Sequence, residues 1–250
     1  MKLSMLSILF FSLIHTYPPH EYHVYFIREM APLYNQAYTG DCTLHIDEYD
    51  PAIMWKQRTY WRNYRSDQSG LVRGEKIGEV KFKMNGMVCP GYIMKNGDAT
   101  DAAIGTPIYT VKGYAEGYRL FVGEDLYEVR KIPGARIIGD FNDIGGKVKK
   151  ITIQYPIENS PSIDLSGEDT QLFVKRYLQL KHVPSSKIYQ QSSVYSQPYF
   201  LKFTLQDHSS FIESFRLEEN AFTLGYGTED TKRILLPYLQ KLPPLPADNR

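Results

Sequence analysis

Cysteine is scarce in this chain of 250 residues, which contains only Cys42 and Cys89. Neither has the paired spacing of a zinc knuckle or of a redox motif, so the sequence does not indicate either kind of site. In an exported protein the two thiols can close a loop that stabilises the fold by about 4 kcal/mol in the chain-entropy model. The alternative is two unpaired buried thiols, because nothing in the sequence shows that the cysteines approach one another.

An excess of charge of either sign is also lacking. Lysine and arginine number 29 against 28 aspartates and glutamates, which gives a formal net charge of +1. The chain therefore has no global field that would attract nucleic acid or an anionic membrane, and any such attraction must come from a local patch. We expect no nucleic-acid partner. The 42% of hydrophobic and 23% of charged residues are typical of a globular protein and exclude wholesale disorder.

Catalytic sequence motifs are missing as well. The chain has no G-x-S-x-G elbow, no H-E-x-x-H pair and no glycine-rich phosphate loop. His15, His20 and His23 cluster within nine residues, but they lie beside two prolines, and an accidental cluster explains them better than a metal site. We therefore predict no catalytic residues, no metal and no cofactor. A glycosidase remains an alternative, because the separation of its two carboxylates is spatial and leaves no sequence motif.

The chain has no hydrophobic run long enough to cross a bilayer, which requires about 20 apolar residues. The longest apolar segment near the start, Met5 to Ile14, follows Lys2 and precedes polar residues and two prolines. This arrangement is typical of the apolar region of a signal peptide. We expect residues 1–20 to be a signal peptide, no transmembrane span, and export to the cell envelope or the exterior. An ordinary buried N-terminal element in a cytoplasmic protein is the alternative.

Aromatic residues are abundant, with 20 tyrosines and 12 phenylalanines, and such side chains fit the half-buried surfaces of sheets. Residues 42–155 consist of short apolar and aromatic runs with two-residue alternation. Turn signals such as Asn85-Gly86 and Asn96-Gly97 separate them. The pattern predicts six to eight short strands in an antiparallel meander, an open barrel or a sandwich.

The rhythm changes beyond the proline and serines of residues 156–162. Phe173, Tyr177 and Leu180 recur at helical spacing, and Ser166 stands where an N-cap is expected. Two alternating segments, at 198–207 and 210–224, predict strands. A final helix should begin after its N-cap Thr228, with Pro237 either kinking it or displacing its start. We therefore predict an α+β, mainly β fold, with a β-rich domain at 40–156 and a helix-strand-strand-helix domain at 163–242.

Two motifs carry a resemblance. The I-G-E-V strand at Ile77 to Val80 and the G-T-x-I-Y-x-V-K-G-Y strand at Gly105 to Tyr114 resemble a β-rich module of uncharacterised exported proteins and lipoproteins of Gram-positive bacteria. The likeness covers about two thirds of the chain, and its motifs are structural. It implies a β-rich fold and export, but no activity, cofactor or functional residue. The lipidated cysteine of the lipoprotein members has no counterpart behind the expected signal here.

The stretch M-W-K-Q-R-T-Y-W-R-N-Y-R, Met54 to Arg65, combines two tryptophans and two tyrosines with four basic residues. In the simplest interpretation it forms two adjoining strands, with Lys56 to Arg58 as a three-residue tip exposed to water. Rings alternating with cations also suit single-stranded nucleic acid, whose bases stack on the rings while the cations follow the phosphates.

Stacking of these rings on the faces of sugars, or their burial against a protein partner, suits an exported protein better than nucleic acid does. The candidate ligand-binding residues are Trp55, Tyr60, Trp61 and Arg62. The sequence thus predicts a non-catalytic binding or interaction module at the cell envelope, with a glycan or an envelope protein as its partner. The alternatives are a hydrolase of envelope material and, if the N-terminus is not a signal, an intracellular structural or inhibitory protein.

Overall fold

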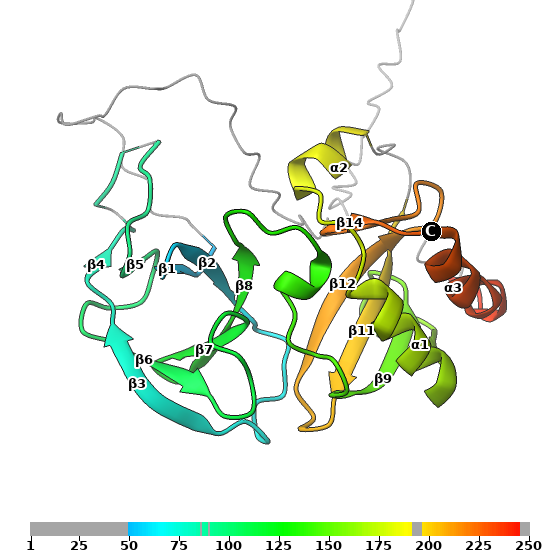
Figure 1. Ribbon diagram of the computed structural model, residues 1–250, viewed down its shortest axis with the longest axis horizontal. Helices are drawn as coiled ribbons and strands as arrows, with labels where there is room; N and C mark the ends of the chain where they lie inside the picture. Colours follow the sequence, from blue (N-terminus) through cyan, green and yellow to red (C-terminus); the bar gives the residue numbers. More distant parts are fainter. Residues whose placement is uncertain (1–49, 86, 90, 192–196, 246–250) are drawn as a thin grey trace, which may run out of the picture. The chain divides into compact units, whose positions relative to one another are not determined.

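The computed structural model describes residues 50–85, 87–89, 91–191 and 197–245. These residues belong to one compact unit, Tyr34–Arg250, and form two β-sheets with three α-helices beside the second sheet (Figure 1). The prediction of a mainly β fold is confirmed. The expected signal peptide at residues 1–20 lies outside the described residues.

The first sheet is curled and has eight strands in the order β3-β6-β7-β8-β2-β1-β5-β4. Its neighbours are antiparallel, except for the parallel pair of β4 and β5. The strands are β1 (Ala52–Trp55), β2 (Arg58–Arg62), β3 (Arg73–Glu79), β4 (Phe82–Lys83), β5 (Asp98–Ala99), β6 (Pro107–Val111), β7 (Arg119–Val122) and β8 (Asp125–Lys131).

The hairpin of β1 and β2 has a shorter tip than the sequence predicted. Lys56 and Gln57 both have positive φ, at 45° and 61°, and Arg58 already pairs with Trp55 across the strands. Positive φ at both central positions belongs to a two-residue turn whose twist matches that of the flanking strands. The three-residue tip was therefore wrong: Arg58 belongs to the sheet, and only Lys56 and Gln57 form the turn.

The second sheet has six antiparallel strands in the order β10-β9-β11-β12-β13-β14. They are β9 (Val148–Gln154), β10 (Ser162–Asp164), β11 (Tyr199–Leu205), β12 (Ser210–Arg216), β13 (Ala221–Phe222) and β14 (Gly225–Tyr226). The predicted first domain included β9, yet β9 pairs with β10 and β11. The expected boundary at 156–162 thus lies at the β9–β10 connection inside one sheet, and the division into two domains stays a prediction.

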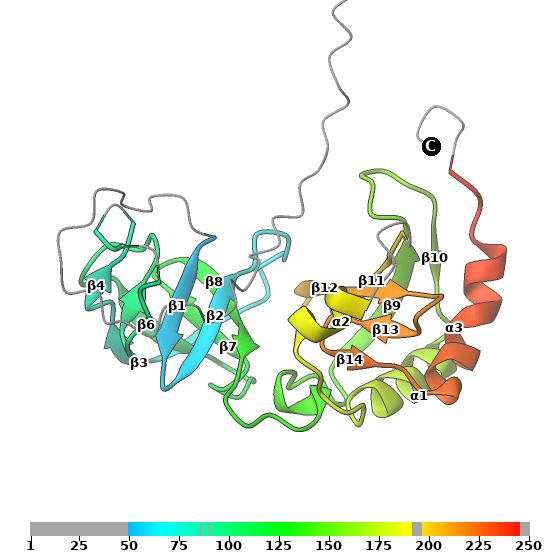
Figure 2. The same cartoon turned by 90° about the horizontal axis from the view of Figure 1, so that it is seen from above.

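The helices are α1 (Gly167–Tyr177), α2 (Ser185–Gln191) and α3 (Glu229–Lys241), and a short 3-10 helix, η1 (Ile138–Asp140), precedes β9. The hydroxyl of Ser166 accepts a hydrogen bond from the backbone N–H of Asp169 and caps α1, as the sequence predicted. Thr228 caps α3 in the same way, with Pro237 inside that helix. Helix α1 packs on β9, and α3 lies beside α1 and β10 (Figure 2).

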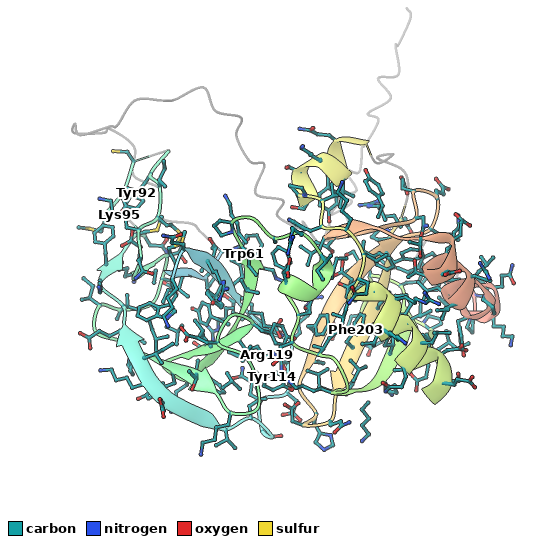
Figure 3. All side chains as sticks on the ribbon, in the orientation of Figure 1. Trp61, Tyr92, Lys95, Tyr114, Arg119 and Phe203 are labelled. Carbon is teal, nitrogen blue, oxygen red and sulfur yellow. The ribbon has the colours of Figure 1, made fainter. Side chains whose placement is uncertain are left out.

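One hydrophobic cluster continues through the interior of both sheets. It contains Ile53 and Leu120 from the first sheet and Phe203 from the second, all fully buried, together with Phe173 and Tyr177 of α1. Figure 3 shows Phe203 between the second sheet and α1. Burial of this aromatic cluster orients α1, so the opposite side of that helix faces outward. None of the helices in the described ranges combines the length and the apolar character needed to cross a bilayer.

Candidate binding groove

A groove of about 490 Å³ lies between α1 and α3, and we call it the α1–α3 groove. Three apolar side chains and a tyrosine share it with three cations and two carboxylates. It is lined by Asp169, Leu172, Arg176, Asp230, Arg233, Ile234, Pro237, Tyr238 and Lys241.

The spacing of the buried residues along each helix decides which side chains reach the groove. Helix α1 buries Phe173 and Tyr177 in the core, which leaves Leu172 at the groove with 41% of its surface exposed. Helix α3 buries Leu235 and Leu239, and Ile234 beside them is partly buried against the core while it also lines the groove. Helical periodicity therefore leaves Leu172 exposed on α1 and Ile234 partly exposed on α3, and both side chains line the groove.

Tyr238 ties the two helices together at one end of the groove. Its hydroxyl accepts a hydrogen bond from the backbone N–H of Ser166 at 2.9 Å and donates one to the carboxylate of Asp169 at 2.6 Å. Both bonds are made at the N-terminus of α1, where backbone N–H groups lack partners within the helix. The tyrosine thus holds the groove's width through contacts with its oxygen, while its ring lines the groove.

Cations outnumber carboxylates around the groove, because Arg176, Arg233 and Lys241 face only two aspartates. The carboxylate of Asp230 interacts with Arg233 at 2.9 Å and with Arg176 at 3.8 Å, and Asp169 is held by the tyrosine. In the part of the chain that the structure describes, Lys241 has no ion pair. An apolar strip beside exposed cations can hold an apolar group next to a carboxylate.

The residues that the sequence singled out lie elsewhere, on the hairpin of β1 and β2. Trp55 is 7% exposed and donates from Nε1 to the carboxylate of Glu116 at 3.1 Å. Tyr60 is fully buried, and its hydroxyl donates to the backbone carbonyl of Glu116 at 3.1 Å. Both rings pack into the core, which places neither face at the surface.

Trp61 and Arg62 are partly exposed and point to opposite faces of the sheet. The guanidinium of Arg62 pairs with Asp125 at 2.5 Å and lies 4.7 Å from the ring centroid of Tyr64, whose side chain is 62% exposed. Of the four candidate ligand-binding residues, the structure leaves these two accessible. It does not bring them to the α1–α3 groove, and their role in binding stays a prediction.

The expected disulfide involves Cys42, which lies outside the described residues. Cys89 carries no free thiol, but its pairing with Cys42 stays a prediction. His15, His20 and His23 also fall outside the described part of the chain. Within that part, no group of three or more histidine, cysteine, aspartate or glutamate side chains is placed to hold a metal ion.

A buried polar network between the sheets escaped the sequence analysis. Arg119 of β7 pairs with Glu128 of β8 at 2.6 Å, with both side chains almost fully buried, and donates to the hydroxyl of Ser209 at 2.7 Å. Asp207 accepts hydrogen bonds from Ser209 and from Tyr114, both at 2.6 Å. Because β7 and β8 pair across a two-residue turn, Arg119 and Glu128 are cross-strand partners, and counting outward from that turn would have found the pair.

The electrostatics of this network keep the carboxylate of Asp207 ionised and the hydroxyl of Tyr114 neutral. Burial and the hydrogen bond to Asp207 raise the pKa of Tyr114 to about 12, so its hydroxyl keeps its proton at neutral pH. Burial alone would raise the pKa of Asp207, but the bonds donated by Ser209 and Tyr114 hold it below its usual value. The rings of Tyr114 and Tyr118 both lie 4.7 Å from the guanidinium of Arg119. Figure 3 shows Tyr114 beside Arg119. Each of these side chains has a hydrogen-bond or ion-pair partner within the network, which indicates that the network has a structural role.

Comparison of the chain with protein-family models, with curated proteins and with solved structures gives no match.

Proposed function

We propose that this protein is an exported, non-catalytic binding module of the cell envelope, and that its α1–α3 groove holds an acidic, partly apolar peptide segment of an envelope protein. The observation that carries the proposal is the excess of cations around the exposed side chain of Leu172. The volume of about 490 Å³ lies within the range typical of ligand sites.

Charge complementarity favours a peptide with carboxylates. The side chain of Arg176 is 55% exposed and that of Arg233 is 76% exposed. Both guanidinium groups can therefore donate hydrogen bonds to a second carboxylate. Arginine matches a carboxylate with two parallel hydrogen bonds, and Leu172 offers an apolar contact in the same groove. A few contacts of this kind correspond to weak binding, with Kd between about 1 μM and 1 mM.

The state of the two groove carboxylates supports binding over hydrolysis. Acid–base catalysis needs a carboxyl group that is free to exchange a proton with a substrate. Asp169 is held by Tyr238, and Asp230 is held by two arginines. A glycan would instead stack on an aromatic face, and the groove offers for this only the ring of Tyr238, which is partly buried against the core.

Binding of a defined peptide tests the groove. The probe is a fluorescein-labelled synthetic peptide of leucine and glutamate, compared by anisotropy with the same peptide carrying glutamine for glutamate. We expect the acidic peptide to bind and the neutral one to bind at least about tenfold more weakly, since each charged hydrogen bond contributes about 1.5–3 kcal/mol. Added salt should weaken the acidic peptide's binding.

Matched variants locate the binding. Arg176→Gln and Arg233→Gln should each weaken binding of the acidic peptide, whereas Lys175→Gln should leave it unchanged, because Lys175 is an exposed cation on α1 that does not line the groove. Equal binding by all three variants, or no preference for the acidic peptide, would reject the groove. If a cell-wall glycan fragment bound to the protein and the acidic peptide did not, a glycan would be the favoured ligand.

Export is tested separately. The protein is expressed in a Gram-positive host, and the N-terminus of the material found outside the cytoplasm is sequenced. We expect the mature chain to begin close to the end of the segment 1–20, because that segment has the apolar core of a signal peptide. A full-length chain confined to the cytoplasm would contradict export and favour the intracellular alternative.

A further inference from the structure

The connection between β4 and β5 presents apolar side chains to solvent. Ile93 is 82% exposed, the highest value among the large apolar residues of the described chain, and Met87 is 66% exposed. Met94, next to Ile93, is partly exposed. A single exposed apolar residue is ordinary on a protein surface, so the meaning of this group depends on how the connection is held and on its charge.

The connection is anchored on both sides of Ile93. The carboxylate of Asp98, which is 4% exposed, accepts one hydrogen bond from the hydroxyl of Tyr92 at 2.8 Å and another from the backbone N–H of Lys95 at 2.6 Å. The ring of Tyr92 lies 6.0 Å from that of Phe82, and Figure 3 shows Tyr92 and Lys95 at the same end of the first sheet. Both anchoring residues are tied to one buried oxygen, and between them Ile93 is exposed and Met94 partly exposed.

The charged residues from Lys81, in front of β4, to Lys95, in the connection, are all lysines. Residues 80–97 contain three lysines and no aspartate or glutamate. Lys83 forms a long ion pair with Asp101 at 3.6 Å. Lys81 and Lys95 are exposed, and within the described residues neither has an ion pair. Although the net charge of the chain is only +1, Lys81 and Lys95 form a local cationic patch beside the apolar tip at Ile93 and Met94.

We propose that this tip, Ile93 and Met94 with Met87, inserts into the interfacial region of an anionic lipid surface while Lys81 and Lys95 contact its headgroups. Apolar side chains that protrude from a basic patch gain both burial in the acyl boundary and attraction to anionic lipid. We favour lipid over a protein partner because the charged residues beside the apolar tip are lysines. This surface lies on the first sheet, independent of the α1–α3 groove, and would hold the protein at a membrane without a transmembrane span.

The test places a reporter on the tip of the full chain. Ile93→Trp and the control Ile104→Trp, at an exposed isoleucine outside this connection, are mixed with vesicles of equimolar phosphatidylglycerol and phosphatidylcholine. We expect the tryptophan of Ile93→Trp to shift its emission to the blue and to be quenched by brominated lipid. The tryptophan of Ile104→Trp should show neither effect. The proposal would be overturned if the two variants showed the same emission shift and the same quenching. This result would also cover the case in which another part of the chain binds the vesicles.

Two further substitutions separate the apolar and the ionic contributions. Ile93→Ser should lower vesicle partitioning about tenfold on the anionic vesicles. Lys95→Gln should lower it about fivefold there and leave the weak partitioning to pure phosphatidylcholine unchanged. Thermal unfolding of each variant shows whether it is folded. Arg233→Gln should retain full vesicle binding, so failure of the peptide groove and failure of the lipid surface remain distinguishable. Unchanged partitioning of folded Ile93→Ser would overturn the inference.

Discussion

Arg119 donates two hydrogen bonds to one carboxylate oxygen of Glu128, from Nε at 2.9 Å and from Nη2 at 2.6 Å. The two side chains are 0% and 4% exposed, so water cannot replace a lost partner. Arg119→Met should lower the free energy of unfolding by about 3–5 kcal/mol, because it leaves a buried carboxylate without a counter-charge. Urea denaturation followed by circular dichroism measures the change.

A double variant and a surface control complete this experiment. Arg119→Met combined with Glu128→Leu should recover most of the loss, since the interior then holds no unpaired charge. Lys76→Gln removes an exposed partner of Glu79 and should cost less than about 1 kcal/mol. If Arg119→Met proved no more harmful than Lys76→Gln, the buried pair of Arg119 and Glu128 would not stabilise the fold.

Gly78, inside the I-G-E-V motif, lies against the indole ring of Trp55. A Cβ added at Gly78 would overlap the ring carbons of Trp55, which is itself almost fully buried. Gly78→Ala should therefore destabilise the protein by about 1–3 kcal/mol through overpacking. Gly167→Ala is the control, because a Cβ there meets no atom within 4 Å and alanine favours a helix. Thermal unfolding should show a lower Tm for the first variant and an equal or higher Tm for the second.

The buried carboxyl group of Glu213 should make the free energy of unfolding depend on pH. Burial raises its pKa above the ordinary value, although hydrogen bonds from the backbone N–H of Thr223 and the hydroxyl of Tyr177 oppose the rise. Between the ordinary and the raised pKa, the folded protein holds a proton that the unfolded chain has released. The contribution of Glu213 to the free energy of unfolding is therefore largest below this window and falls as the pH rises through it.

The variant Glu213→Gln isolates this effect, because its side chain does not titrate. The free energy of unfolding of the wild type minus that of the variant should fall from acidic to neutral pH and become constant above the raised pKa. Urea denaturation across that range provides both values. A difference that rises with pH would mean that the two hydrogen bonds outweigh burial.

A disulfide between Cys42 and Cys89 predicts that the oxidised protein contains no free thiol. Mass spectrometry of non-reduced proteolytic fragments should recover the two cysteines in one linked peptide. Reduction should lower the free energy of unfolding by about 4 kcal/mol, because the unfolded chain regains the freedom of the open loop. Cys89→Ser should be as stable as the reduced wild type and indifferent to reducing agent. Two reactive thiols in unreduced material would contradict the bond.

Local features of the fold could be predicted because they depend on neighbouring residues. Side-chain alternation predicted β11 and β12 within the segments 198–207 and 210–224, but not the short β10. Ser166 marked the start of α1 because a cap acts on a backbone N–H three residues away. Thr228 marked the start of α3 for the same reason. The tip of the β1–β2 hairpin was one residue shorter than predicted, since the pairing of Arg58 with Trp55 depends on register rather than on residue type.

The candidate sites depended on distant contacts and were mostly not predicted. Trp55 and Tyr60 looked like binding residues because rings and cations alternate along the hairpin, yet both side chains turn inward to Glu116. The α1–α3 groove needs Tyr238 to join the start of α1 to the end of the chain's last helix. No pattern within either helix contains that information.

The sequence by itself determined the mainly β character, the capped helices and the absence of an overall charge, because each follows from residue type or from spacing along the chain. The tertiary structure alone decided that β9 joins the second sheet, which aromatic rings are buried, and which cations gather around the groove. Those properties arise from strand pairing and from competition for the interior among residues far apart in sequence, which periodicity cannot express.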